Sequence, residues 1–157
     1  LKTLNWEELQ DFNCCQKTWE DSPYGREKDF YGTSNKNRNT MTTDGTARIM
    51  EEIIQNISFN EKNINLKNCL FREIKEQSQD KDVNNQINGF LGEGLPQKIP
   101  FWSKAGLMSE ARHDAAWWIN KNQSKTLLVV FTEGKEFAND NKFLPEFSKA
   151  IYEFIHS

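Results

Sequence analysis

The chain has 157 residues, of which 36% are hydrophobic, and its 20 basic and 23 acidic residues give a formal net charge of -3. This length suits one hydrophobic core, so we expect a single domain, and the scattered charges argue against nucleic acid as a partner. No apolar run approaches the roughly eighteen residues needed to cross a bilayer, so no transmembrane segment is expected.

The sequence over residues 1–40 is polar, rich in Asn, Gly and aromatic residues, and without a sustained period, which predicts long loops with short strands or turns. Apolar residues then recur at helical spacing from Ile49 to Ile57. They predict a helix over about 43–56, with Thr43 as the N-cap.

A second helix is predicted to follow directly. Ser58 and Glu61 have the spacing of a capping box, and an apolar stripe continues to about Gln77. The charged, amide-rich stretch 78–88 is interpreted as a solvated connection, and the Gly and Pro residues of 89–100 extend the irregular region.

Beyond residue 100 the apolar period changes to two, which predicts three strands joined by short polar turns into an antiparallel meander. The strand containing 127–131 is apolar throughout and should be covered on both faces. A helical stripe from Leu144 to Ile155 predicts a final helix packed on the sheet. We therefore expect an α+β fold with helices flanking an antiparallel sheet. The predicted strands are 101–108, 113–119 and 126–132.

The first predicted strand carries a Lys-Ala-Gly sequence at Lys104, Ala105 and Gly106, flanked by Ser103 and Leu107. Alone it is a weak signal, because a lysine on an edge strand often serves only to prevent aggregation. Its position strengthens it: the motif opens an antiparallel hairpin, precedes an apolar strand and the last helix, and follows a helix that begins with a Thr-Thr pair.

Further segments share their order with one enzyme family. Together they resemble the second half of class A β-lactamases and related penicillin-binding proteins, and most closely a cyanobacterial branch of β-lactamase-like serine hydrolases. The resemblance implies that 1–157 is the C-terminal portion of a single domain, comprising an omega-like loop region (1–40), a helical part (41–98) and sheet strands with the final helix (99–157). The segments are Gln16-Lys17-Thr18-Trp19, Pro23-Tyr24-Gly25-Arg26-Glu27, Asn37-Arg38-Asn39, Thr42-Thr43-Asp44, 89–96 and Ser103-Lys104-Ala105-Gly106.

The resemblance also implies roles for the motif. Lys104 would place a cation beside the substrate carboxylate and the proton-relay groups, Gly106 would allow close approach, and the N–H of Leu107 would donate to the oxyanion. Ala105 replaces a Thr or Ser whose hydroxyl binds the carboxylate of β-lactams, which argues against ordinary β-lactam recognition. The substrate-binding residues implied are Ser103, Ala105, Gly106, Trp19 and Tyr24.

The nucleophilic Ser of the family, the Lys one helical turn after it and the Ser-Asp-Asn loop precede the omega loop, so we expect them outside this sequence, which opens without Met. Ser78 and Lys81 satisfy Ser-x-x-Lys, but they follow the Thr-Thr helix in a solvated linker, and we interpret the match as a coincidence. Glu20 and Glu27 are candidate deacylation bases, although neither has the Asn four residues on that class A enzymes use.

Other reactive residues are interpreted as structural. His113 and Asp114 are adjacent on a strand and should point to opposite faces, with Asp114 a polar anchor, and the tryptophans of the sheet should belong to the core. Three cysteines and two histidines predict neither a disulfide nor a zinc site. No metal and no cofactor are expected.

The expected function is that of a serine hydrolase fragment that transfers an acyl group to water through a Ser ester, with a β-lactam, peptidoglycan-like peptide or ester as substrate. A catalytically inactive binding or structural module is the alternative, and an unrelated α+β domain would leave Lys104 pointing away from any cleft. A sheet edge left exposed predicts a partner, either the chain's own N-terminal portion or a second copy. Family context favours the cell envelope or periplasm, whereas unpaired cysteines favour a reducing compartment.

Overall fold

The computed structural model describes residues 6–13, 28–29, 39–55, 64–79, 81–82 and 85–156. The chain divides into two compact units, Leu1–Arg48 and Ile49–Ser157. Within the described ranges, no helix has both the length and the apolar character needed to cross a membrane.

Little regular structure precedes the first long helix among the residues described there. Glu7–Leu9 form a short 3-10 helix, η2, and Asn13 pairs with Thr40 in an isolated antiparallel bridge. The rest of the predicted loop region, apart from 28–29, lies outside the described residues: 1–5, 14–27 and 30–38.

Helix α2 spans Thr43–Gln55, which confirms the first predicted helix. Its N-cap is Thr42 rather than Thr43, because the Thr42 Oγ1 accepts a hydrogen bond from the N–H of Gly45 at 3.0 Å. Thr43 is already the first helical residue. The predicted cap was therefore wrong by one position, since two adjacent threonines offer the same hydroxyl.

The single second helix was a wrong prediction, because a strand interrupts it. Phe71 pairs with Trp102 and Arg72 with Phe101, so the segment leaves the helical conformation to join the sheet. These partners lie far along the chain, and local periodicity could not reveal them. The predicted capping box at residues 58 and 61 lies outside the described residues. The observed elements are α3 (Ile64–Leu70), β1 (Phe71–Arg72) and α4 (Ile74–Gln77).

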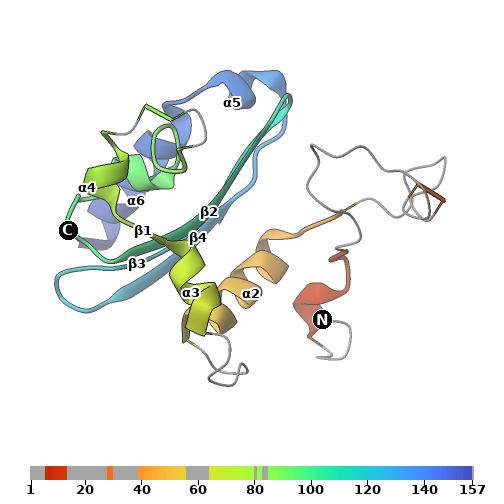
Figure 1. The fold of residues 1–157 in the computed structure, drawn as a ribbon, viewed down its shortest axis with the longest axis horizontal. Coiled ribbons are helices and arrows are strands. Elements are labelled where there is room, and N and C mark those ends of the chain that lie inside the picture. The colour runs from red at the N-terminus through yellow and green to blue at the C-terminus, as the bar shows by residue number, and fades with distance from the viewer. Residues whose placement is uncertain are drawn as a thin grey trace. The chain divides into compact units, whose positions relative to one another are not determined.

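The sheet has four strands in the order β1-β2-β3-β4, and every neighbouring pair is antiparallel (Figure 1). This confirms the meander and adds β1 to it. Strand β3 begins at Ala111 rather than His113, and β4 ends at Val130 rather than Thr132. The other strands are β2 (Phe101–Met108), β3 (Ala111–Ile119) and β4 (Lys125–Val130).

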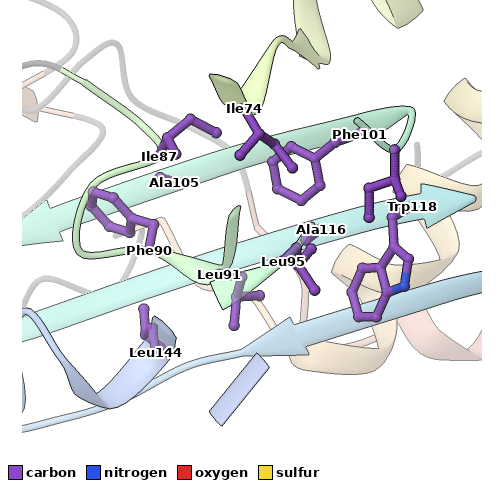
Figure 2. Packing of buried hydrophobic residues seen from close by; sticks show 11 residues of the cluster. Ile74, Ile87, Phe90, Leu91, Leu95, Phe101, Ala105, Ala116, Trp118 and Leu144 are labelled. Carbon is purple, nitrogen blue, oxygen red and sulfur yellow. The ribbon is translucent and has the colours of Figure 1, made fainter. Parts of the chain in front are cut away.

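One face of the sheet packs under helices from the C-terminal part of the chain. Phe101 and Trp118 are fully buried there, beneath the 3-10 helix η4 (Leu91–Gly94) and helix α6 (Phe143–His156) (Figure 2). Helix α6 confirms the predicted final helix packed on the sheet, and a short helix, α5 (Lys135–Asn139), precedes it. The buried members of this cluster are Ile74, Ile87, Phe90, Leu91, Leu95, Ile99, Phe101, Ala105, Ala116, Trp118 and Leu144.

The second face carries a smaller cluster in which Trp102 and Trp117 pack with Met50 and Ile54 of α2. The three tryptophans of the sheet are thus core residues, as predicted. Residues of β4 contribute alternately to the two clusters, which confirms that this strand packs on both faces: Leu128 and Val130 on the first, Leu127 and Val129 on the second.

Candidate active site

Strand β2 has an open edge where it carries the Lys-Ala-Gly motif. It pairs with β3 along its whole length but with β1 only at Phe101 and Trp102. Among the described residues, no strand covers the outer side of 103–108. Backbone N–H groups of an antiparallel strand alternate in direction, and that of Ala105 points outward, donating to Oε1 of Gln86 at 3.2 Å. By this alternation the N–H of Leu107 points to the same edge.

The ammonium group of Lys104 lies on this edge as well. Its Nζ donates a hydrogen bond to the carbonyl oxygen of Ala105, the outward carbonyl of the next residue. Partial burial lowers the pKa of Lys104, repulsion from Arg72 lowers it further, and Asp114 acts in the opposite direction. The Lys104 ammonium and the outward N–H of Leu107 therefore lie on the same edge of β2.

The other residues of the motif are divided between the core and the surface. Ser103 and Ala105 are buried on the face that packs under η4 and α6, so their side chains do not reach the open edge. Gly106 is exposed, and a Cβ placed there would meet no atom within 4 Å. Leu107 is 46% exposed. The structure thus brings Lys104, Gly106 and Leu107 together at the surface.

Four further predicted site residues, Trp19, Glu20, Tyr24 and Glu27, lie outside the described residues. Their predicted roles in substrate contact and deacylation remain predictions.

Two residues at the open edge, Gln86 and Arg72, were not predicted as site residues from the sequence. Gln86 accepts the hydrogen bond from Ala105, and the Nη2 of Arg72 donates to the same Oε1 at 3.4 Å. The sequence predicts a helix at Arg72 and a solvated connection at Gln86. No local signal marks either residue, because their meeting depends on the long-range pairing of β1 with β2.

Asp114 lies beneath the edge, as the cross-strand partner of Ala105. It is fully buried, and its Oδ2 accepts a hydrogen bond from the N–H of Leu91 at 3.0 Å. Its Oδ1 has no hydrogen-bond partner among the described residues. Burial raises the pKa of Asp114 to about 7 against the effect of hydrogen bonds from Leu91 and Ala115. The predicted role as a polar anchor is consistent with this contact to η4.

His113 points to the other face of the sheet, as predicted. Its Nδ1 accepts a hydrogen bond from the N–H of Thr132 at 3.1 Å, and its ring lies 4.7 Å from that of Phe131. Burial lowers the pKa of His113. His113 and Asp114 therefore cannot act as an acid–base pair.

Replacing Asp114 with asparagine is expected to remove a pH dependence of stability. The folded state raises the pKa of this carboxyl group, so it binds more protons than the unfolded state between about pH 4 and pH 7. Stability from this group is present below about pH 4 and is lost as the pH rises through 7. Urea unfolding from pH 4 to 8 should show that the free energy of unfolding falls with rising pH in the native protein and falls less steeply in Asp114→Asn. Equal slopes would contradict the raised pKa of Asp114.

A hollow borders β1 away from the motif. It is lined on one side by 71–76 and on the other by 97–100, and no residue of 103–107 contributes to it. In the described part of the chain, no group of three or more His, Cys, Asp and Glu residues could hold a metal ion. The open edge is the place where the predicted motif and unpaired backbone coincide.

This architecture, an antiparallel sheet between helices, is that of the class A β-lactamase and transpeptidase fold. The family model described as "Beta-lactamase enzyme family" matches residues 6–155. The chain belongs to this family. No curated protein matches it.

Solved structures agree on the fold. A β-lactamase from Burkholderia vietnamiensis superposes with a TM-score of 0.59 at 12% identity, over 78% of this chain and 43% of that one. A β-lactamase from Streptosporangium roseum gives 0.58 at 17% identity, over 83% and 47%. PBP-A gives 0.55 at 15% identity, over 77% and 42%. The chain therefore spans less than half the length of these proteins.

Proposed function

We propose that this chain forms the cationic edge of a serine hydrolase of the β-lactamase and penicillin-binding type, which transfers an acyl group to water through a Ser ester. The observation that carries the proposal is that the Lys104 ammonium and the outward N–H of Leu107 share one open strand edge. Membership of the β-lactamase enzyme family supports the reaction class.

In this proposal each group at the edge has a separate task. Lys104 attracts the substrate carboxylate and stabilises proton relay from the nucleophile, while the N–H of Leu107 donates to the oxyanion that develops on the attacked carbonyl. The open space at Gly106 lets the substrate lie against the backbone. Ser103 and Ala105 take part through their backbone, because their side chains are buried.

The nucleophile in this proposal comes from polypeptide outside these 157 residues. The chain would be the C-terminal portion of one β-lactamase-like domain, from a branch similar to the cyanobacterial one, and the remainder would be its own N-terminal portion or a second copy. The share of the solved neighbours that the chain covers, 43% for the first, supports this. So does the outer edge of β4, which has no strand partner among the described residues.

The proposed substrate is a small acyl compound such as a β-lactam, a peptidoglycan-like peptide or an ester, and the proposed site of action is the cell envelope. A mutant of PBP-A has been solved as an acyl-enzyme complex with penicillin G. Trp19 and Tyr24 are proposed to contact the substrate, and Glu20 or Glu27 to assist deacylation.

A catalytically inactive binding module is the second candidate, favoured by one observation. The side chain of Ala105 is only a methyl group, and the residue is 6% exposed within the core cluster under η4 and α6. No side-chain group at this position can therefore bind a substrate carboxylate. Such a module would retain the fold and bind ligands without forming a covalent bond.

Labelling of the native protein separates the two candidates. The protein as isolated from its source is incubated with a fluorescent penicillin and, in parallel, with a fluorophosphonate. The hydrolase should form a covalent adduct with at least one probe, and heat-denatured protein should form none. Absence of an adduct with both probes would overturn the hydrolase and support the inactive module.

A further inference from the structure

On an exposed strand edge, the outward backbone N–H groups are normally free to donate hydrogen bonds to a ligand. In β2 the outward groups at residues 105 and 107 lie about 7 Å apart, because each strand residue advances the chain by about 3.4 Å. An acyl substrate that lies beside Gly106 could therefore place its carbonyl on the N–H of either Ala105 or Leu107. Catalysis requires that the reacting carbonyl of every substrate molecule binds in the same register, so a group at the edge has to favour one of the two.

The side chain of Gln86 binds one of these two N–H groups, that of Ala105. Its Oε1 accepts the N–H of Ala105 at 3.2 Å, as the carbonyl of a neighbouring strand would. No such acceptor contacts the N–H of Leu107 among the described residues. Leu107 is itself 46% exposed, and the space beside Gly106 is open.

The amide of Gln86 is held in place by Arg72. The Nη2 of Arg72 donates to the same Oε1 at 3.4 Å, while Nη1 donates to the carbonyls of Cys69 and Phe71 at 2.9 Å each. Arg72 is fixed in turn, because it pairs with Phe101 at the start of β2. Gln86 is therefore tied to the same strand whose N–H it covers.

We propose that Gln86, braced by Arg72, is a positioning residue that sets the register of the substrate on the edge of β2. By covering the N–H of Ala105 it leaves the N–H of Leu107 as the donor for the reacting carbonyl. This inference rests on the proposed hydrolase function and deepens it. Arg72 also adds a second positive charge near Lys104, which favours an anionic substrate.

The test replaces Gln86 with methionine, which has a similar shape but no strong acceptor, and with glutamate, which restores an acceptor. Gln79→Met is the matched control, because Gln79 is exposed and distant in sequence from the motif. Backbone hydrogen exchange of the native protein is measured at Ala105 and Leu107, and the rate of acylation by a fluorescent penicillin is measured on the same samples.

In Gln86→Met we expect exchange at Ala105 to accelerate at least about tenfold and acylation to slow about tenfold, since misplacement by about 1 Å can cost up to about 100-fold. Gln86→Glu should restore both, and Gln79→Met should change neither. Unchanged exchange at Ala105 would overturn the hydrogen bond from Ala105 to Gln86. Faster exchange with unchanged acylation would overturn the positioning role, leaving only a structural one. Failure of the unmutated protein to react at all would instead overturn the proposed function.

Discussion

Replacing Lys104 with alanine is expected to slow acylation of the native protein by a fluorescent penicillin about 100- to 1,000-fold, the cost of removing one preorganised electrostatic group from an acyl-transfer site. The ammonium lies on the open edge at the carbonyl of Ala105. The effect should be confined to chemistry, because Lys104 is not a member of either core cluster. Stopped-flow fluorescence measures the rate, and chemical denaturation checks the fold.

Lys121→Ala is the matched control for this experiment. Lys121 is an exposed lysine in the turn between β3 and β4, so it removes the same charge elsewhere on the sheet. Its acylation rate should equal that of the unmutated protein. Equal rates for Lys104→Ala and Lys121→Ala would contradict the role given to Lys104 and leave it as an edge lysine that prevents aggregation.

The largest effect on stability is expected from Gly94→Ala, which should lower the free energy of unfolding by about 3 kcal/mol, at the upper end of the usual cost of overpacking. A Cβ at Gly94 would lie 2.0 Å from the carbonyl oxygen of Pro145 and 2.4 Å from the Oγ of Ser148. Ser148 cannot simply rotate away without loss, because its buried Oγ donates to the carbonyl of Leu91 at 2.7 Å. Either η4 or α6 must shift.

Gly106→Ala provides the control, since the added methyl group meets no atom within 4 Å. Its free energy of unfolding should stay within about 0.5 kcal/mol of that of the unmutated protein. Urea denaturation of the two variants gives the comparison. A Gly94→Ala protein as stable as Gly106→Ala would show that η4 and α6 are not packed as closely as described.

Elements with a strong local period could be predicted from the sequence. The apolar stripes of α2 and α6 place both helices to within one or two residues, and the alternation from Phe101 onward predicts β2, β3 and β4. The two-residue strand β1 could not be predicted, because its only reason to be a strand is its pairing with Phe101 and Trp102. The short helices η4 and α5 depend in the same way on contacts distant in sequence.

Only the part of the candidate site that has a local sequence pattern could be predicted. The Lys-Ala-Gly motif identified the strand, and the period of two indicated which N–H groups share an edge. It did not indicate that Ser103 and Ala105 would face the core, or that Gln86 and Arg72 would meet at the N–H of Ala105. The sequence around a glutamine in a polar segment does not show whether its side chain binds a strand edge or is solvated. Only the fold brings these residues together.

We propose that this chain is part of a serine hydrolase whose nucleophile lies outside the 157 residues. The most direct test is to react the native protein with a penicillin, measure its intact mass, and locate the modified residue by peptide mapping. We expect a longer polypeptide or complex with one acyl adduct on the Ser of a Ser-x-x-Lys sequence absent from residues 1–157. A protein that consists of these residues alone and gains no adduct, or one modified at Ser78, would contradict it.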